Sequence, residues 1–575
     1  MEMRVRVLGC GLLISLAVFC LASVSWGQGA DKAERVLFNA KVFTGVPDHP
    51  YAEAVAIRGD KIVAVGSLAE VLPAVDKNAA RVDLQGKFLL PGLIDSHAHP
   101  IYGGLTLVSV DVNDEVASMD ALAGIAAAAK RSGKGMRGDI LFISGMPLVY
   151  WSKTDELNAR FSSGVYADAP VFLRGSDGHT GWANGALLRR VGVTKDFLSH
   201  LSPAERAYYG IDSTGNPNGF TVDVGREKIE AVIPEPSPEQ YLEGGQAAVK
   251  YMHSLGITAW LDALADPPIL ATYKKLAERG ELTVHVAAFP KVNPRNEPAK
   301  ELEAVQKIRQ EYANIPNLTV PGIKVFADGV MEYPSQTAAM TKPYRNTGKS
   351  GDLLFDPARF AELATLADKQ GLIVHVHALG DRAVKEALNG IAAARKANGN
   401  SGLPDALTHL QVVDPEDFPR FRQLGVIAAF QLLWATAEPD TIELIKPYLD
   451  PELYRWQYPA RSILDAGGTI SGASDWFVSS PNVFWAIYQA ETRKGPEGVL
   501  DASQCVPREA MFYAYTRNSA RAMNQQDKIG SLAPGMQADL VLVDRDVLTV
   551  TPEEMRDTKV LWTMVGGVTV YRAQP

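Results

Sequence analysis

Two histidines stand one residue apart at the end of an apolar run, in the stretch PGLIDSHAHP. Alternate side chains of a β-strand point to the same face, so His97 and His99 can reach one ion together. Imidazole and carboxylate groups are the ligands expected for a zinc-like divalent cation. The stretch therefore predicts a metal site at the end of a strand.

Further groups that could bind a metal or move a proton lie on other apolar runs. A second pair, His375 and His377, lies at the end of one such run, and His409 lies on a third. No generic packing requirement explains two such pairs and a further histidine on these runs. His285 also lies in a strand-like run, but nothing else points to it, and we interpret it as a core residue. The predicted groups beyond the first pair are Lys324, His375, His377, His409 and Asp475.

These groups need a scaffold that brings several strand ends together. Between about residues 90 and 480, eight apolar runs alternate with helical stretches, as is typical of βα units around a parallel sheet. We therefore predict an α/β protein whose catalytic unit, residues 89–524, is a (β/α)8 TIM-like barrel, with its site at the C-terminal ends of the strands. The eight runs are FLLPGLIDSHAH, GITAWLDA, LTVHVAAF, GIKVFADG, GLIVHVHALG, DALTHLQVV, GVIAAFQL and TISGASDW.

One segment inside this unit does not fit the βα pattern. Residues from about 113 to 250 are too many for an ordinary βα connection, and they contain the strand-like runs LFISGMPL and PVFLRGSDGH. We interpret the segment as an insertion after the first barrel strand. If PVFLR were a barrel strand instead, the count would rise to nine and one assignment above would be wrong.

Both ends of the chain contain short runs in which apolar and polar residues alternate, as in β-strands. RVLFNAKVFTG and AVAIRGDKIVAVG, within residues 28–88, resemble ADLVLVDRD and TKVLWTMVGGVTVYRA, within residues 525–575. We predict that these two parts pair into one small composite β-sandwich beside the barrel.

The first thirty residues have the architecture of a secretory signal. Arg4 and Arg6 precede a long apolar run that ends in small residues, which predicts a signal peptide over residues 1–27 and a periplasmic or secreted protein. Cleavage would leave Cys505 as the single cysteine, so no intrachain disulfide could form. The alternative is an uncleaved anchor, since the run is almost long enough to span a bilayer; after cleavage we expect no stable membrane insertion.

Composition narrows the class of partner. The chain has 575 residues, a net charge of -9 and a pI near 5.7. This acidic balance does not indicate a positively charged surface for binding nucleic acid. Its length and 46% hydrophobic content allow a large buried core. A small-molecule substrate is the better expectation, and a homo-oligomer is left open.

The motifs together resemble the amidohydrolase superfamily, and within it amidohydrolase family 3, which includes N-substituted formamide deformylases. The resemblance runs from about residue 35 to the C-terminus and implies the metal-dependent barrel with a composite sandwich. The metal ligands that it implies are His97, His99, Lys324, His377, His409 and Asp475. The matching stretches are LLPGLIDSHAHP, RGSDGHTGWANGALL, SLGITAWLDA, GIKVFADGV with TAAMTKPY, HVHALGDRAV, LTHLQ, ASDW and GSLAPGMQADLVLVD.

Two of these ligand assignments leave a choice: which histidine of the second pair binds the metal, and whether Lys324 is carboxylated. We expect His377 as the ligand because it lies nearer the C-terminal end of its strand, with His375 one layer deeper. An ammonium beside two divalent cations would be repelled, so Lys324 is expected to be carboxylated and to bridge two zinc ions. Alternatively, Lys324 stays protonated and pairs with Asp328 or Asp475, leaving one metal.

The insertion supplies candidates for substrate binding. In GSDGHTGW, His179 and Asp177 could project into the barrel mouth to orient the substrate or stabilise an oxyanion, and Trp182 is a further candidate. The DG pair is also ordinary turn chemistry. Asp381, at the start of a helical stretch, is explained by an N-cap role.

The predicted chemistry is hydrolysis of a non-peptide carbon–nitrogen bond in an amide, N-acyl or cyclic amide compound. A metal lowers the pKa of its bound water towards about 7, and Asp475 serves as general acid and base, with Lys324 as the bridging member of the catalytic site. Deamination, isomerisation or ester cleavage at the same centre are alternatives, because fold and ligands are shared across many reactions. A non-catalytic exported binding protein is the remaining alternative.

Overall fold

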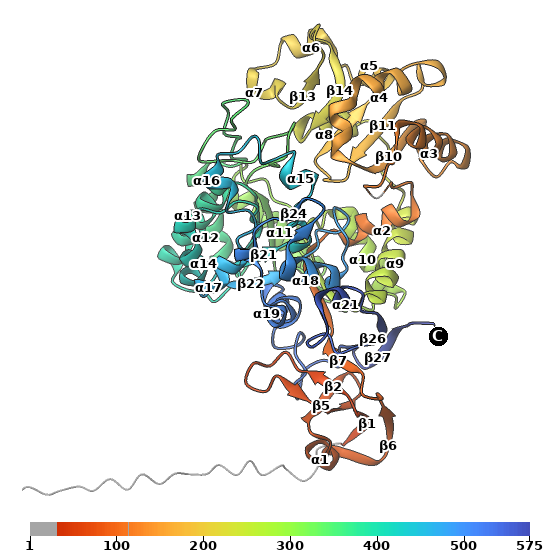
Figure 1. Cartoon of the computed structure of the whole chain (residues 1–575). Helices are drawn as coiled ribbons and strands as arrows, with labels where there is room; N and C mark the ends of the chain where they lie inside the picture. Colours follow the sequence, from red (N-terminus) through yellow and green to blue (C-terminus); the bar gives the residue numbers. More distant parts are fainter. Residues whose placement is uncertain (1–31, 113, 575) are drawn as a thin grey trace, which may run out of the picture.

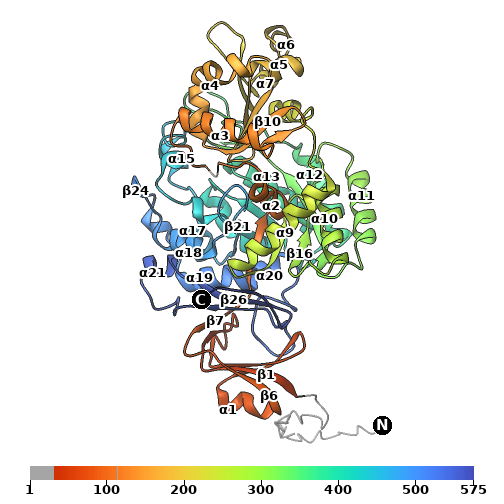
Figure 2. The ribbon, with the colours of Figure 1, turned by 90° about the vertical axis from the view of Figure 1, so that its right-hand side faces the viewer.

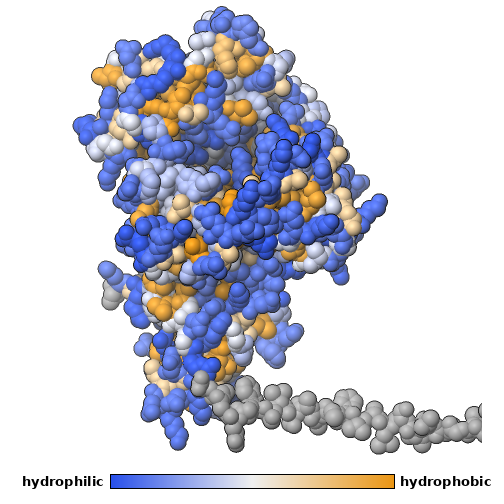
Figure 3. Space-filling view, turned by 180° about the vertical axis from the view of Figure 1, so that it is seen from behind, coloured by the Kyte–Doolittle hydropathy of each residue, from blue (hydrophilic) through white to orange (hydrophobic). Residues whose placement is uncertain are grey.

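The computed structural model describes residues 32–112 and 114–574. The predicted signal peptide over residues 1–27 lies outside this part of the chain. Within it, no helix is both long and apolar enough to cross a membrane. Seen from behind, hydrophobic side chains form scattered patches in a mainly hydrophilic surface (Figure 3).

The centre of the molecule is built from buried parallel strands, and all of them except the two-residue β17 coincide with the eight predicted runs. They form two sheets, of order β17-β16-β15-β8 and β18-β19-β20-β21-β22. Parallel strands covered on both faces are apolar throughout, which is why these runs lack an alternating pattern. The strands are β8 (Leu93–Ala98), β15 (Ile257–Asp262), β16 (His285–Ala288), β17 (Leu318–Thr319), β18 (Gly322–Phe326), β19 (Ile373–Ala378), β20 (Ala406–His409), β21 (Ile427–Phe430) and β22 (Thr469–Gly472).

Backbone hydrogen bonds join the two sheets at both edges. On one side, the Lys324 amide donates to the Pro290 carbonyl at 2.9 Å, next to strand β16. On the other, the Asp475 amide donates to the His97 carbonyl at 2.8 Å, and the His99 amide donates to the Trp476 carbonyl at 2.6 Å. The carboxyl ends of β8 and β22 therefore lie side by side.

Helices cover the outside of these strands (Figure 2). Helix α9, which forms the last part of the insertion predicted over about residues 113–250, packs against α2 and β15 of the central unit. A Cβ on Gly104 of α2 would lie 1.8 Å from the Gly244 carbonyl oxygen of α9, so only glycine allows this close approach. The main covering helices are α2 (Pro100–Val108), α9 (Pro238–Ser254), α10 (Pro267–Glu278), α11 (Pro298–Glu311), α12 (Pro357–Lys369), α13 (Asp381–Asn398), α14 (Phe418–Leu424), α17 (Ala460–Asp465), α18 (Val483–Thr492), α19 (Arg508–Tyr513) and α20 (Ser519–Ala522).

The inserted segment forms a separate layer above the strand ends (Figure 1). Its sheet has the order β13-β14-β12-β11-β10-β9 and its own apolar core. PVFLR is strand β11 of this sheet, so the alternative of nine barrel strands is wrong. The elements are α3 (Met119–Ser132), β9 (Met136–Arg137), β10 (Ile140–Met146), α4 (Thr154–Phe161), β11 (Val171–Gly175), β12 (Thr180–Ala183), α5 (Gly185–Arg190), α6 (Lys195–Ser199), α7 (Pro203–Arg206), β13 (Tyr209–Ile211), β14 (Pro217–Val222) and α8 (Val224–Glu230).

Strands from the two ends of the chain share one sheet at the opposite pole. The order β27-β26-β25-β7-β2-β3 places three C-terminal strands beside N-terminal ones, and the sheet β5-β4-β1-β6 packs near it through a common apolar cluster. Strand β7 spans the predicted boundary at residue 88 and belongs to this unit. The strands are β1 (Ala33–Phe38), β2 (Lys41–Phe43), β3 (Tyr51–Ala52), β4 (Ala54–Arg58), β5 (Lys61–Gly66), β6 (Val75–Asp83), β7 (Phe88–Pro91), β25 (Leu540–Val543), β26 (Val560–Val565) and β27 (Val568–Arg572).

Candidate metal centre and substrate cavity

Three predicted ligands converge at the joined ends of β8 and β22. The Oδ1 atom of Asp475 lies 3.2 Å from Nε2 of His97 and 3.0 Å from Nε2 of His99. One potential ligand atom from each residue lies within 4.8 Å of the other two. The Asp475 oxygen is buried and has no hydrogen-bond partner among the described residues, which suits an atom that completes its bonding with a cation.

The other predicted ligands line the same cavity. The rings of His377 and His409 lie 4.6 Å apart, and Nδ1 of His409 is 4.0 Å from the second oxygen of Asp475. The Nζ atom of Lys324 is 3.4 Å from Nε2 of His97. The six residues proposed from the sequence are thus neighbours around one point, although the structure assigns no ligand role to them.

Burial sets the charge state of the histidines. It is the largest cause that lowers the pKa of His97, His377 and His409 well below the ordinary value, and neighbouring cationic groups add to it. These imidazoles are therefore neutral near pH 7. A neutral imidazole has a free lone pair, which is the form that binds a divalent ion. The residues present fit a metal.

Lys324 lies in a site that disfavours its charge. Burial first, and then Lys291, lowers its pKa to about 7, against the opposing attraction of Asp475. Its Nζ lies 4.8 Å from the centre of the Phe326 ring. No carboxylate among the described residues forms an ion pair with it, so the predicted pairing with Asp328 or Asp475 is absent. Asp328 instead accepts backbone hydrogen bonds from Ala339, Leu379 and Gly380.

Local structure fixes the ligands before any ion is bound. The Asp95 carboxylate accepts hydrogen bonds from the backbone of His97 and Ser474, and from the Ser474 hydroxyl at 2.5 Å, which ties β8 to the segment after β22. His409 and Asp475 have φ of +77° and +57°. Such left-handed conformations cost free energy in residues other than glycine and concentrate at functional sites.

Three other residues considered in the sequence have structural contacts. His375 lies beneath the site, where its Nε2 is 2.6 Å from Nδ1 of His97 and can fix that ring. His285 pairs with Asp539 of the sandwich at 3.0 Å. The N-cap role expected for Asp381 is wrong, because Gly380 is the N-cap of α13 and the Asp381 carboxylate accepts hydrogen bonds from Thr341.

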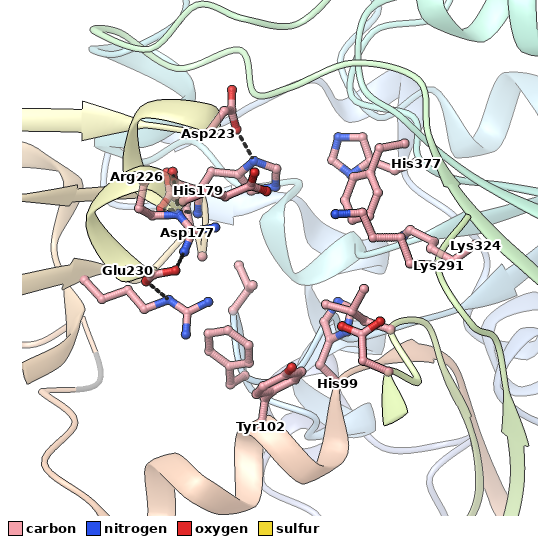
Figure 4. Close-up of a pocket in the computed structure, with 18 of the residues that line it drawn as sticks. His99, Tyr102, Asp177, His179, Asp223, Arg226, Glu230, Lys291, Lys324 and His377 are labelled. Carbon is pink, nitrogen blue, oxygen red and sulfur yellow. Dashed lines mark hydrogen bonds and ion pairs between the residues drawn. The ribbon is translucent and has the colours of Figure 1, made fainter. Parts of the chain in front are cut away.

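A cavity of about 490 Å³ separates the strand ends from the inserted domain (Figure 4). His179 enters it from the inserted domain, and its ring lies 5.5 Å from that of His377. Its Nδ1 is 2.7 Å from an oxygen of Asp223, whose other oxygen accepts a hydrogen bond from Thr337 at 2.9 Å. Burial opposes the charge, but Asp223 raises the pKa of His179 above its ordinary value.

Asp177 and Trp182 differ from His179 in what they can do. Asp177 lines the cavity, but one of its oxygens accepts hydrogen bonds from the backbone of His179 and Thr180, so it shapes the turn. Trp182 is fully buried inside the inserted domain and donates to the Asn218 carbonyl at 3.1 Å. The substrate-binding role predicted for Trp182 is therefore wrong: strand β12 turns its indole into the domain core.

Several residues that line the cavity are not among those predicted from the sequence. Asp223, Arg137 and Arg174 come from three different elements of the insertion, and Phe477 directly follows the segment that carries Asp475. No motif or spacing relates them to the histidines. The one available signal was that RGSDGH places an arginine five residues before His179 at a strand end.

Comparison with known proteins agrees with this geometry. A model of the amidohydrolase family matches residues 80–571. The chain belongs to this family. This amidohydrolase is 27% identical over 558 residues to Protein LONG AFTER FAR-RED 3 of Arabidopsis thaliana, covering 94% of this chain and 92% of that protein. It is 25% identical over 553 residues to the N-substituted formamide deformylase of Arthrobacter pascens, covering 93% and 98%.

A solved structure resembles this amidohydrolase over most of its length. The crystal structure of an uncharacterised metal-dependent hydrolase from Pyrococcus horikoshii OT3 superposes with a TM-score of 0.69 at 24% identity. The match covers 90% of this chain and 99% of that one. At this identity the likeness establishes the shared fold, and the chemistry is argued from the site.

Proposed function

We propose that the protein is a metal-dependent amidohydrolase that hydrolyses a non-peptide carbon–nitrogen bond in a small amide, N-acyl or cyclic amide compound. The observation that carries the proposal is the convergence of His97, His99 and Asp475 within 4.8 Å at the floor of a substrate-sized cavity. Membership of the amidohydrolase family supports a hydrolase acting on such bonds.

The donor set favours zinc or a similar ion. Imidazole nitrogen and carboxylate oxygen are typical zinc donors, and His97, His99, His377, His409 and Asp475 would hold one or two ions. When bound, such an ion supplies Lewis acidity, which activates water at neutral pH and polarises a carbonyl. The eight strands, joined at both edges, support a (β/α)8 barrel as the frame of this site.

Side chains of the chain itself move the protons. Asp475 is the carboxylate nearest the converging imidazoles, and we assign to it the uptake of a proton from the attacking water and its delivery to the leaving nitrogen. His179, held by Asp223, lies on the opposite side of the cavity, where it can donate a hydrogen bond to the substrate carbonyl oxygen.

Lys324 is the candidate bridge between two ions. Its buried position without a carboxylate partner favours the neutral amine. A neutral amine can attack carbon dioxide, forming an N–C bond and releasing one proton, and the product is an anionic carbamate. An anionic group at this position would replace the missing carboxylate beside the histidines.

Metal content tests the proposal. We expect elemental mass spectrometry of protein from residue 28 onward, purified without chelator and with bicarbonate, to find two zinc-like ions per chain. Lys324→Ala should reduce this to one or none, while Lys307→Ala, at an exposed ion pair of α11, should leave it unchanged. One ion in both proteins would overturn the bridge, and no ion would overturn the metal-dependent function.

The predicted export and the small-molecule partner complete the proposal. The basic residues and apolar run of the first 27 positions support a periplasmic or secreted enzyme. The cavity volume of about 490 Å³ lies in the range of small-molecule sites, which supports a compact substrate.

A further inference from the structure

Three arginines lie in the wall of the cavity that the inserted domain forms. Arg137 comes from β9, Arg174 from β11 and Arg226 from α8, and all three line the cavity. Glu230 forms an ion pair with Arg226 four residues before it, and Oε2 of Glu235 accepts a hydrogen bond from the Tyr241 hydroxyl at 3.1 Å. The inserted domain also lines the cavity with five carboxylates, so what distinguishes the arginines is how their hydrogen bonds are satisfied; the carboxylates are those of Asp177, Asp223, Glu227, Glu230 and Glu235.

Arg174 is the least satisfied of these cations. Its nearest carboxylate oxygen, on Glu230, is 3.6 Å from Nε, beyond hydrogen-bond distance, because Arg226 holds Glu230 from the other side. Its Nε is buried without a hydrogen-bond partner among the described residues. A buried donor left unsatisfied costs free energy, so the site favours a group that would accept its hydrogen bonds.

Arg137 adds a second guanidinium to the same place. It packs over the Phe142 ring at 4.2 Å and forms no ion pair with a carboxylate in the described part of the chain. Burial and then the neighbouring charge of Arg174 lower the pKa of Arg137. Two like charges held together beside an open cavity are stabilised by an anion between them.

An apolar path connects this pair to the metal centre. The Arg174 guanidinium lies 5.2 Å from the centre of the Phe477 ring, and the same ring lies 6.3 Å from that of His99. Tyr102 flanks Phe477 at 6.4 Å (Figure 4). A substrate with its scissile bond at the histidines would therefore pass along an aromatic ring before it reached Arg174.

We propose that Arg174 and Arg137 form an anion-binding subsite that selects substrates with a carboxylate at the end remote from the scissile bond. The subsite rests on the proposed amide hydrolysis at the metal centre and narrows its substrate class to apolar or aromatic amides that carry a terminal carboxylate. The planar guanidinium fork suits bidentate recognition of that group.

Several of the cavity acids already interact with other groups. Asp266 also lines the cavity, and its largest interaction with an opposite charge is with Lys291. Asp223 is engaged by His179 and Thr337. Of the three arginines in this wall, Arg226 pairs closely with Glu230, whereas Arg174 and Arg137 have no carboxylate within hydrogen-bond distance in the described part of the chain.

A matched pair of probes tests the subsite. The carboxylate 4-(formamidomethyl)benzoate and the uncharged 4-(formamidomethyl)benzamide share a size, an aromatic body and a scissile bond. We expect the metal-loaded enzyme to prefer the carboxylate in kcat/KM by about tenfold or more. Arg174→Gln and Arg137→Gln should each remove most of this preference through KM, whereas Arg160→Gln, at an exposed ion pair of the same domain, should retain it.

A binding measurement separates this proposal from the proposed function. The amines 4-(aminomethyl)benzoate and 4-(aminomethyl)benzamide lack the formamide group, and calorimetric titration of metal-depleted protein reports their affinities without turnover. Titration of metal-depleted protein also excludes coordination of the carboxylate by the metal. Preference for the benzoate that Arg174→Gln abolishes supports the subsite even if neither formamide is hydrolysed, an outcome that would count against the proposed hydrolysis of these amides.

The opposite results would overturn the subsite. Hydrolysis of both formamides at equal kcat/KM, with equal affinity for the two amines, refutes it while the proposed function stands. An unchanged carboxylate preference in both arginine variants, each shown by circular dichroism to be folded, refutes the assignment of these residues.

Discussion

The two walls of the cavity are built in different ways. On the strand side, His97, His377 and His409 are at most 3% exposed and are placed by the ends of hydrogen-bonded parallel strands. On the insertion side, the paired side chains of His179 and Asp223 are 22% and 16% exposed, and side-chain contacts hold them. Backbone register thus fixes the metal centre, while the wall that faces the substrate can change without disturbing it.

The largest effect is expected on the strand wall, at Asp475. Replacing Asp475 by Asn keeps the shape but removes the proton acceptor and an anionic ligand, so kcat for an amide substrate should fall by about 10²–10⁴-fold. Asp465→Asn, at an exposed ion pair of α17, is the control and should change nothing. Steady-state kinetics with metal content measured in parallel would contradict the assignment if kcat stayed within about threefold.

On the insertion wall, His179 should matter less than Asp475. His179→Gln removes a cationic hydrogen-bond donor that faces the carbonyl, and we expect about a hundredfold loss of kcat/KM with the metal retained. The exposed His200 lies in the same domain, and His200→Gln is the matched control. If His179→Gln lost the metal as well as activity, His179 would contribute to metal binding, and the two walls would not have separate roles.

The sequence could predict one wall much better than the other. HxH pairs and strand-end residues follow a fixed period, so the positions of His97, His99 and His377 could be read from their spacing. Arg174 and Asp223 approach the cavity through the fold of a domain inserted elsewhere in the chain, and no period links them to the histidines. The alternating pattern also placed the end of the insertion at about residue 250, because an amphipathic helix such as α9 fits either unit.

Trp182 shows the same limit at a single residue. A conspicuous aromatic side chain beside His179 suggested contact with substrate, but alternate residues of β12 point to opposite faces. Without the partner strands, the sequence cannot tell which face meets the cavity and which the domain core. The structure decides this through the pairing of β12 with β11 and β14.

A smaller effect is expected at Asp223, which acts through His179. Asp223 raises the pKa of His179, so Asp223→Asn should lower that pKa. Activity that needs protonated His179 is lost as the pH rises through its pKa, and the alkaline limb of the kcat/KM profile should therefore move to lower pH, with about a tenfold loss at the optimum. Asp196→Asn, exposed in the same domain, should leave the limb in place. An unmoved limb in Asp223→Asn would refute the positioning role.

The burial of Lys324 in the strand wall should make the free energy of unfolding depend on pH. Its pKa is lowered to about 7 in the folded protein, so between that pH and its ordinary value of 10.5 the unfolded chain binds a proton that the folded chain does not. Without metal and carbon dioxide, the contribution of Lys324 to the free energy of unfolding should rise with pH through this window, by at most about 1.4 kcal/mol per pH unit.

Urea unfolding at several pH values measures this contribution. The stability gained by Lys324→Met over the unsubstituted protein should be greatest below about pH 7 and should shrink as the pH rises. Lys307→Met, at an exposed pair on α11, should show no such trend. A gain that is constant with pH would mean that the buried amine keeps an ordinary pKa.

The smallest effect on catalysis is expected at Trp182, although it adjoins the insertion wall in sequence. Trp182→Phe leaves a void in the domain core and removes one of the two hydrogen bonds to the Asn218 carbonyl, which should cost about 1–3 kcal/mol of unfolding free energy. Because the indole does not reach the cavity, kcat/KM should stay within about twofold at a temperature where the domain remains folded. A large rise in KM without loss of stability would instead show that Trp182 contacts the substrate, and the insertion wall would then extend into β12.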